Sequence, residues 1–239
     1  MFSNFDVYYL SPLKKDIEKI VCHDTFLFTE PKAIERSKSY YSLKAKSYNH
    51  ISAFLAEGIK TGQHFSSHYE FFEMAKQVFE KYLTSSIQFE GCNKLLRKDG
   101  IPLSETQIQP FIFSILNPLF NLLLVHYVKE PELAGGKVDF LLSYNSMSEL
   151  YTIAVEFKLA HHEEIDHGLT TQLPAYMDAK QSKYGIFLVF WFKDNNFPNP
   201  TKYADSDKLK IHLKELIPED KVIEIIIIDC SNHPPPSKR

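Results

Sequence analysis

A continuous apolar run at residues 184–192 limits what this chain can fold into more than any other feature. Its length and bulk are typical of a β-strand that is covered on both faces. Residues 151–159 and 221–229 form two similar segments, and the second has high β propensity. Segments with helical spacing lie between these strands, at residues 163–180 and 205–216. We therefore expect an α/β domain with a mixed central sheet flanked by helices.

A β-hairpin is expected at residues 137–159, with the apolar segment 151–159 as its second strand. Residues 137–142 are β-branched and apolar, follow the Gly135-Gly136 turn, and predict a strand. The turn residues 145–148 connect it to the strand at 151–159. The two strands should therefore pair antiparallel, which places the start of the first beside the end of the second.

Polar side chains on this hairpin indicate a site. Asp139 lies near the start of the first strand, and Glu156 and Lys158 lie near the end of the second. Side chains alternate along a strand, so Glu156 and Lys158 project on one side and Phe157 on the other. Two carboxylates on adjacent strands suit one hard divalent cation, with the main-chain carbonyl of Phe157 as a further ligand. Lys158 would then stabilise charge that develops on a phosphate.

The helical segment at residues 163–180 carries two more polar candidates. Gln172 and Tyr176 are four residues apart, so they are neighbours on one helix face. Pro174 lies between them and removes a backbone hydrogen bond. We expect either a kink or a restart of the helix at this proline.

These residues, in this order, resemble the PD-(D/E)xK nucleases, the restriction-endonuclease-like superfamily. The resemblance covers roughly residues 100–230 and includes a Gln-x-x-x-Tyr element. It implies a restriction-endonuclease-like core and a Mg²⁺- or Mn²⁺-dependent nuclease acting on DNA, in bacterial defence, restriction or repair. It also implies that Asp139 and Glu156 bind the metal and that Lys158 is catalytic. The matching segments are Gly135-Gly136-Lys137-Val138-Asp139, Glu156-Phe157-Lys158 and Gln172-Leu173-Pro174-Ala175-Tyr176.

Other residues are assigned more weakly. The resemblance suggests a catalytic glutamate on the helix before the first strand, and Glu105 is the candidate. Ser104 and Gln107 have the spacing of a capping box that would start a helix there, although Pro110 would fall in its interior. Gln172 is expected to orient the site. Three residues are expected to contact substrate: Tyr176, Lys137 and His161.

Each candidate also has a simpler interpretation. Asp139 could cap a strand end, and Glu156 and Lys158 could form an exposed pair worth roughly 0.2–1 kcal/mol. Glu105 could be a first-turn glutamate favoured by the helix dipole. Only the whole ordered set favours a metal site.

Charge and cysteine content limit the function classes. The net charge is −3, so the overall charge of the chain does not indicate nucleic-acid binding. A catalytically inactive nucleic-acid-binding or scaffold subunit of a larger complex, with a protein partner or a second copy, is therefore an open alternative, as is an RNA substrate. The three cysteines are scattered, which argues against a zinc module and a disulfide scaffold.

The chain is expected to comprise an N-terminal mainly helical region, residues 1–98, and a nuclease-like domain, residues 99–239. A basic and aromatic cluster at residues 32–48 suits either a solvated helix face or a phosphate backbone. The apolar window at residues 108–125 contains two prolines and two asparagines, so a buried helix is favoured over a membrane span. No secretory signal is recognisable, and a cytoplasmic location is expected.

Overall fold

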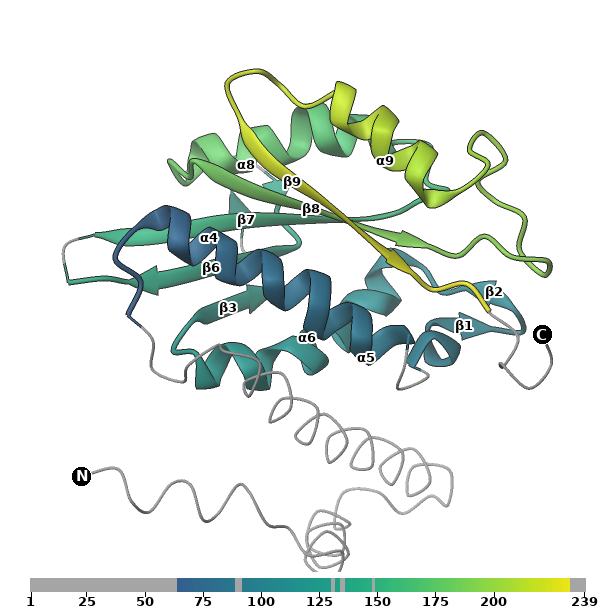
Figure 1. Ribbon diagram of the computed structural model, residues 1–239, viewed down its shortest axis with the longest axis horizontal. Coiled ribbons are helices and arrows are strands. Elements are labelled where there is room, and N and C mark those ends of the chain that lie inside the picture. Colours follow the sequence, from purple (N-terminus) through teal and green to yellow (C-terminus); the bar gives the residue numbers. More distant parts are fainter. Residues whose placement is uncertain (1–63, 89–91, 130–131, 134–135, 148, 233–239) are drawn as a thin grey trace, which may run out of the picture. The chain divides into compact units, whose positions relative to one another are not determined.

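The described part of the chain is a mixed α/β domain built around one five-stranded sheet (Figure 1). The computed structural model describes all residues except 1–63, 89–91, 130–131, 134–135, 148 and 233–239. The chain divides into two compact units, Met1–Ala56 and Glu57–Arg239, and every described residue belongs to the second. The basic and aromatic cluster at residues 32–48 lies outside the described residues.

The five-stranded sheet is mixed and has the strand order β3-β6-β7-β8-β9. The pairs β3–β6 and β6–β7 are antiparallel, whereas β7–β8 and β8–β9 are parallel. Helices lie in the two parallel connections, because parallel neighbours require a crossover. The strands are β3 (His126–Lys129), β6 (Phe140–Asn145), β7 (Leu150–Leu159), β8 (Tyr184–Trp191) and β9 (Val222–Asp229).

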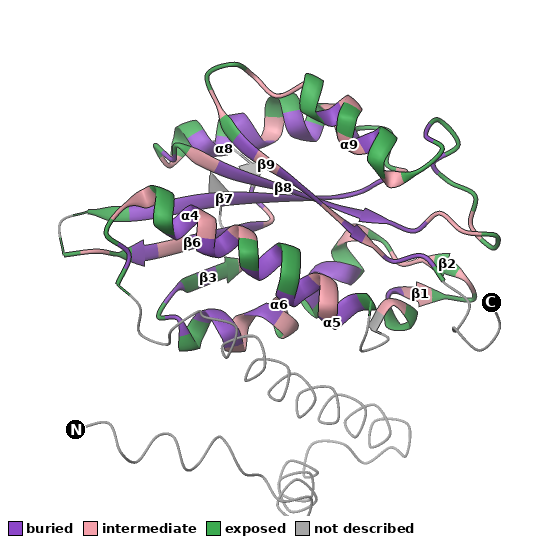
Figure 2. Ribbon diagram, viewed as in Figure 1, coloured by how far each residue is buried: buried purple, intermediate pink, exposed green. Residues whose placement is uncertain are grey.

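The three apolar runs of the sequence form β7, β8 and β9, and the expected hairpin is β6–β7. Figure 2 shows that β7 and β8 are buried along nearly their whole length, as expected for central strands covered on both faces. β9 is one of the two edge strands, and its burial is less complete.

Helices cover both faces of the sheet (Figure 1). One face carries α8 and α9, whose apolar side chains form a common buried cluster with Phe187 and Val189 of β8. The other face carries α4, α5 and α6. None of the described helices is long and apolar enough to cross a bilayer. The helical segments are α4 (His68–Gln77), η2 (Val78–Leu83), α5 (Thr84–Gln88), η3 (Cys92–Leu96), α6 (Glu105–Leu122), α7 (Ile165–His167), η4 (Gly168–Gln172), α8 (Leu173–Ala179) and α9 (Ser206–Glu215).

The described helices before residue 98, from α4 to η3, are part of the sheet domain. α4 contacts β7 and β8, and η2 and α5 contact β9. Apolar side chains of these helices, such as Phe72 and Phe79, are buried. The boundary between the two compact units lies between Ala56 and Glu57.

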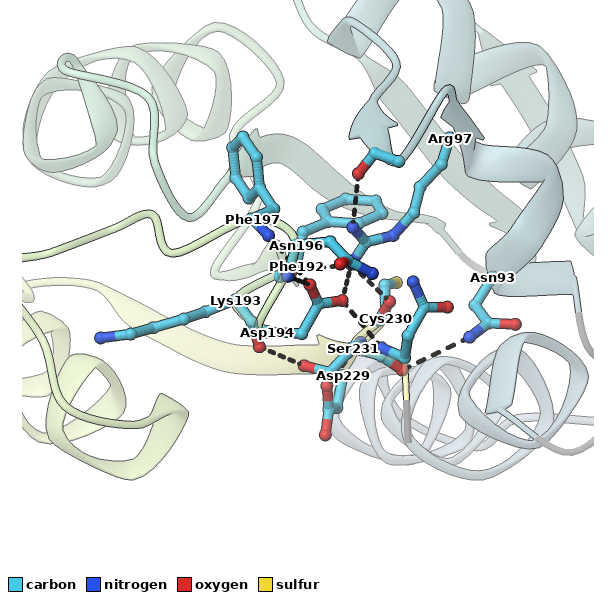
Figure 3. A network of polar contacts seen from close by, with 12 residues as sticks. Asn93, Arg97, Phe192, Lys193, Asp194, Asn196, Phe197, Asp229, Cys230 and Ser231 are labelled. Atoms are coloured by element: carbon cyan, nitrogen blue, oxygen red, sulfur yellow. Dashed lines mark hydrogen bonds and ion pairs between the residues drawn. The ribbon is translucent and has the colours of Figure 1, made fainter. Parts of the chain in front are cut away.

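A buried polar network joins residues just before α6 to the ends of β8 and β9 (Figure 3). Arg97 lies in β1 (Arg97–Lys98), which pairs with β2 (Ile101–Pro102) across a turn with Gly100 at φ +82. Its Nη2 lies 2.8 Å from Asp194 Oδ2 and donates to the main-chain oxygens of Phe192 and Cys230. The network thereby fixes the segment from which α6 begins.

Candidate functional site

Glu156 and Lys158 lie side by side near the end of β7, on the sheet face that η4 and α8 cover. Glu156 Oε1 is 2.9 Å from Lys158 Nζ. The two residues are only 3% and 8% exposed, so they are not an exposed surface pair. The expected strand alternation is confirmed, since Phe157 between them is buried against Phe190, 4.8 Å away, in the other direction.

Asp139 lies beside them, immediately before β6 rather than inside a strand. The expected strand at residues 137–142 begins only at Phe140, because Gly136–Lys137 forms the short strand β5, paired with β4 (Glu132–Leu133). Asp139 Oδ2 accepts a hydrogen bond of 2.7 Å from the main-chain N–H of Phe157. The Asp139 side chain therefore accepts a hydrogen bond that a neighbouring strand would otherwise accept, at the point where β7 extends past the start of β6.

Glu105 is brought to the same place by α6. The helix begins with Ser104 as its N-cap, and the Ser104 N–H donates to Gln107 Oε1, as the capping-box spacing predicts. Glu105 Oε1 accepts a 2.9 Å hydrogen bond from the Leu159 N–H, and Oε2 lies 3.7 Å from Lys158 Nζ. Glu105 is thus more than a first-turn residue facing water.

The helix α6 continues through two prolines, of which Pro110 argued against a helix in the sequence. Pro110 and Pro118 both lie inside Glu105–Leu122. Each removes one backbone hydrogen bond, but the apolar face of the helix, with Ile108 and Ile112, is fully buried. Packing of this face outweighs the two missing bonds.

The main-chain carbonyl of Phe157 faces the same group of side chains. The N–H groups of Phe157 and Leu159 both point to Asp139 and Glu105, away from β8. The N–H and C=O of one strand residue point to the same side. The Phe157 carbonyl is therefore directed toward the edge that holds Asp139.

Gln172 and Tyr176 lie on η4 and α8, over the Glu156 side of the sheet. The chain does not break at Pro174; it passes from the π-helical turn η4 into α8, with the proline in the first turn of α8. Among the described residues, the buried Gln172 Oε1 has no hydrogen-bond partner. Burial raises the pKa of Tyr176, and the negative charges of Glu156 and Asp139 raise it further.

Burial makes the carboxyl groups hard to ionise. It is the main cause that raises the pKa of Glu156 to about 8, and the charge of Asp139 adds to it while Lys158 opposes it. Burial also raises the pKa of Asp139 to about 6 against the Phe157 hydrogen bond and Lys158. For Lys158, burial lowers the pKa, but Glu156 and the other carboxylates outweigh it and leave a net increase.

The charges of this group fit a divalent cation. Three carboxylates, from Glu105, Asp139 and Glu156, face one ammonium group, so full ionisation leaves an excess of two negative charges. Glu156 Oε2 is buried and, within the part of the chain that the structure describes, has no hydrogen-bond partner. The described residues contain no ready-made cluster of three or more His, Cys, Asp or Glu side chains for a metal ion. Asp139, Glu156 and the Phe157 carbonyl are the groups suited to hold one, with Glu105 turned to Leu159 and Lys158.

The remaining predicted residues lie near the end of β7 or outside the described side chains. His161 follows β7, its Nδ1 is buried without a partner among the described residues, and its ring meets the edge of Phe197 at 4.8 Å. The side chain of Lys137 lies outside the described residues. Sequence reasoning missed Gln109, whose Nε2 donates to Asp139 Oδ1 at 2.5 Å. Its spacing of four from Glu105 is the one signal that could have pointed to it.

A family model described as "Domain of unknown function (DUF8371)" matches residues 71–194, just over half of the chain. The chain belongs to this family. The matched segment starts in α4, ends just after β8, and contains every residue of the site described above. The chain has no significant match among curated proteins or among solved structures.

Proposed function

We propose that this member of the DUF8371 family is a metal-dependent nuclease with a restriction-endonuclease-like core, which hydrolyses phosphodiester bonds in DNA. One observation carries the proposal: three carboxylates and one lysine gather at the end of a buried central strand, with an acidic oxygen of Glu156 lacking a partner among the described residues. Burying charged groups is unfavourable unless they are paired. A bound cation would therefore stabilise the ionised form of a buried cluster that has more carboxylates than ammonium groups.

The residues of the site have distinct roles in this proposal. Asp139, Glu156 and the Phe157 carbonyl would hold Mg²⁺ or Mn²⁺, since oxygen ligands are those that hard cations take. The cation, when bound, would lower the pKa of a water molecule and neutralise charge on the phosphate. Glu105 positions Lys158 and the end of β7.

Lys158 supplies the positive charge of the protein at the reacting phosphate. Its ammonium group lies among three carboxylates, and its net raised pKa keeps it protonated at neutral pH. A buried ammonium stabilises negative charge on phosphate oxygens more strongly than an ammonium in water. Gln172 and Tyr176 approach from the covering helix, where a carboxamide and a hydroxyl suit contacts to phosphate or to a bound water.

The proposal is tested by incubating the purified full-length chain with plasmid and linear DNA, with Mg²⁺, Mn²⁺ or a chelator. Cleavage is expected with either cation and none with the chelator. Asp139→Ala and Lys158→Ala should each reduce cleavage by about 10² or more, the usual contribution of a group acting in the transition state.

Matched controls are available at the surface. Glu219→Ala and Lys214→Ala remove the same charges from exposed positions and should leave cleavage unchanged. Cleavage that survives Asp139→Ala and Lys158→Ala as well as it survives the controls would contradict the proposed site.

A non-catalytic nucleic-acid-binding or scaffold role is the second candidate, favoured by the net charge of −3. A chain of this kind would bind DNA without cleaving it and would show no thermal shift with Mg²⁺ or Mn²⁺. A cation that binds only the folded state stabilises it by about 2.7 kcal/mol at a hundredfold excess over the Kd. Competition between labelled DNA and RNA separates the two substrate classes.

A further inference from the structure

We propose that Gln109 is a positioning residue that fixes the carboxylate of Asp139 for cation binding. This inference rests on the proposed function. It assigns a role to a residue that is not part of the sequence motif from which that function was inferred. Gln109 lies inside α6, only 4% exposed, in a helix that otherwise buries apolar side chains on this face.

The geometry places Gln109 and Glu105 together. They are four residues apart in α6, so they share a helix face, from which Glu105 reaches the end of β7 and Gln109 reaches Asp139 beside it. Glu105 accepts a hydrogen bond from β7, whereas Gln109 donates one to Asp139. One turn of helix thus supplies an acceptor for the strand edge and a donor for the neighbouring carboxylate.

Asp139 is held from two sides. Gln109 Nε2 donates to its Oδ1 at 2.5 Å, and the Phe157 N–H donates to its Oδ2 at 2.7 Å. Because Asp139 precedes β6 and is not in the strand ladder, these two bonds define the plane of its carboxylate. Each carboxylate oxygen has two lone pairs, so one on each oxygen stays available to a cation.

The chemistry of a neutral amide suits this position. A fourth carboxylate here would repel Asp139, and a lysine or arginine would compete with the cation for it. A glutamine donates a hydrogen bond without changing the charge of the site. Residues that orient a ligating carboxylate typically change metal affinity or activity by about 10- to 100-fold when they are lost.

The inference is tested with Gln109→Met, which keeps the length of the side chain and removes the donor. Mn²⁺ binding is measured by isothermal calorimetry on the full-length chain, and folding by circular dichroism. We expect a Kd for Mn²⁺ about 10- to 100-fold higher than that of the wild type. Gln77→Met, at an exposed position of α4, is the matched control and should bind as the wild type does.

A second variant keeps the test decisive if Gln109→Met does not fold. Gln109→Asn retains a polar amide but is one methylene shorter, so it falls short of Asp139 and should weaken Mn²⁺ binding likewise. Wild-type affinity in a folded Gln109→Met or Gln109→Asn protein overturns the inference and leaves the proposed function standing. Absence of Mn²⁺ binding by the wild-type chain overturns the proposed function itself.

Discussion

Glu156 and Lys158 form an ion pair of 2.9 Å inside the protein, two positions apart on one face of β7. Removing one partner of a buried ion pair is strongly destabilising, because the other charge is left without compensation. Here the pair also has Asp139 and Glu105 around it, and the lysine is the positive group to which both glutamates are paired.

Replacing Lys158 with methionine should abolish DNA cleavage and reduce stability moderately. Breaking a buried pair usually costs about 3–5 kcal/mol. We expect a smaller loss of unfolding free energy at neutral pH, because the raised pKa of Glu156, about 8, already favours its neutral form and little uncompensated charge is left behind. Urea unfolding checks the stability and a cleavage assay the activity; a fully active Lys158→Met protein would contradict the role of this lysine.

Gly168 is predicted to be required for the position of Lys158. A Cβ at residue 168 would lie 2.8 Å from Lys158 Cε, closer than packed carbons approach. Gly168→Ala should therefore displace the ammonium group and reduce cleavage by about 10²-fold, as a displacement of about 1 Å can do. The stability should change less, because alanine favours a helix over glycine by up to about 1 kcal/mol.

Gly185→Ala is the matched control for that experiment. Its Cβ would meet Met177 Sδ at 2.7 Å, in the core and away from Lys158. We expect Gly185→Ala to lower the melting temperature while the folded protein cleaves DNA normally. If both alanine variants lost activity only in proportion to stability, the positioning role of Gly168 would be wrong.

Stability without divalent cations should fall as the pH rises from about 4.5 to 8. The pKa values of Asp139 and Glu156 are about 6 and about 8 in the folded chain, against ordinary values of 3.8 and 4.5. Folding therefore favours the protonated carboxyls, and their contribution to the unfolding free energy is present below the ordinary values and lost as the pH rises through the folded ones.

Urea unfolding in a chelator across this pH range measures the effect. Glu156→Gln cannot ionise at this position and should give a flatter profile than the wild type. Saturating Mn²⁺ should also reduce the decline, because a cation binds the ionised carboxylates. A wild-type profile that rises between pH 6 and 8 in chelator would contradict the burial of these groups as the dominant cause.

Asp194→Ala should destabilise the protein without touching the chemistry. Asp194 pairs with Arg97 inside the domain and accepts hydrogen bonds from the main-chain N–H groups of Asn196, Phe197 and Asn232. Its loss leaves a buried guanidinium unpaired, which costs about 3–5 kcal/mol. Thermal unfolding measures this loss, with the exposed Asp207→Ala as control; a change no larger than that of the control would show that the network of Figure 3 contributes little.

The central strands, the Glu156 and Lys158 pair on β7 and the nearby Asp139 were predictable from local pattern. Continuous apolar runs define β7, β8 and β9, and strand alternation then places Glu156 and Lys158 on one face. Local pattern was less informative where tertiary packing determines which side chains come into contact. Gln109 sits in a helix interior beside a proline, and only the docking of α6 against the end of β7 reveals its contact with Asp139.

The described helices before residue 98, from α4 to η3, illustrate the same limit. The sequence predicted a mainly helical region but not what its helices would cover, and α4, η2 and α5 pack on the sheet. The π-helical turn η4 is a further case. Pro174 signalled a disturbance in the helix, yet the chain accommodates it by a change in helical geometry without a break.

The most direct measurement is a crystal structure of the wild-type chain soaked with Mn²⁺, with anomalous scattering to locate the ion. The account predicts an anomalous peak bound by Asp139, Glu156 and the Phe157 carbonyl, at about 2.0–2.6 Å from their oxygens, as hard cations bind. It also predicts that Glu156 Oε2, buried and without a partner among the described residues, is a ligand. Manganese bound elsewhere, with Asp139 and Glu156 still engaged only by Gln109, Phe157 and Lys158, would contradict it.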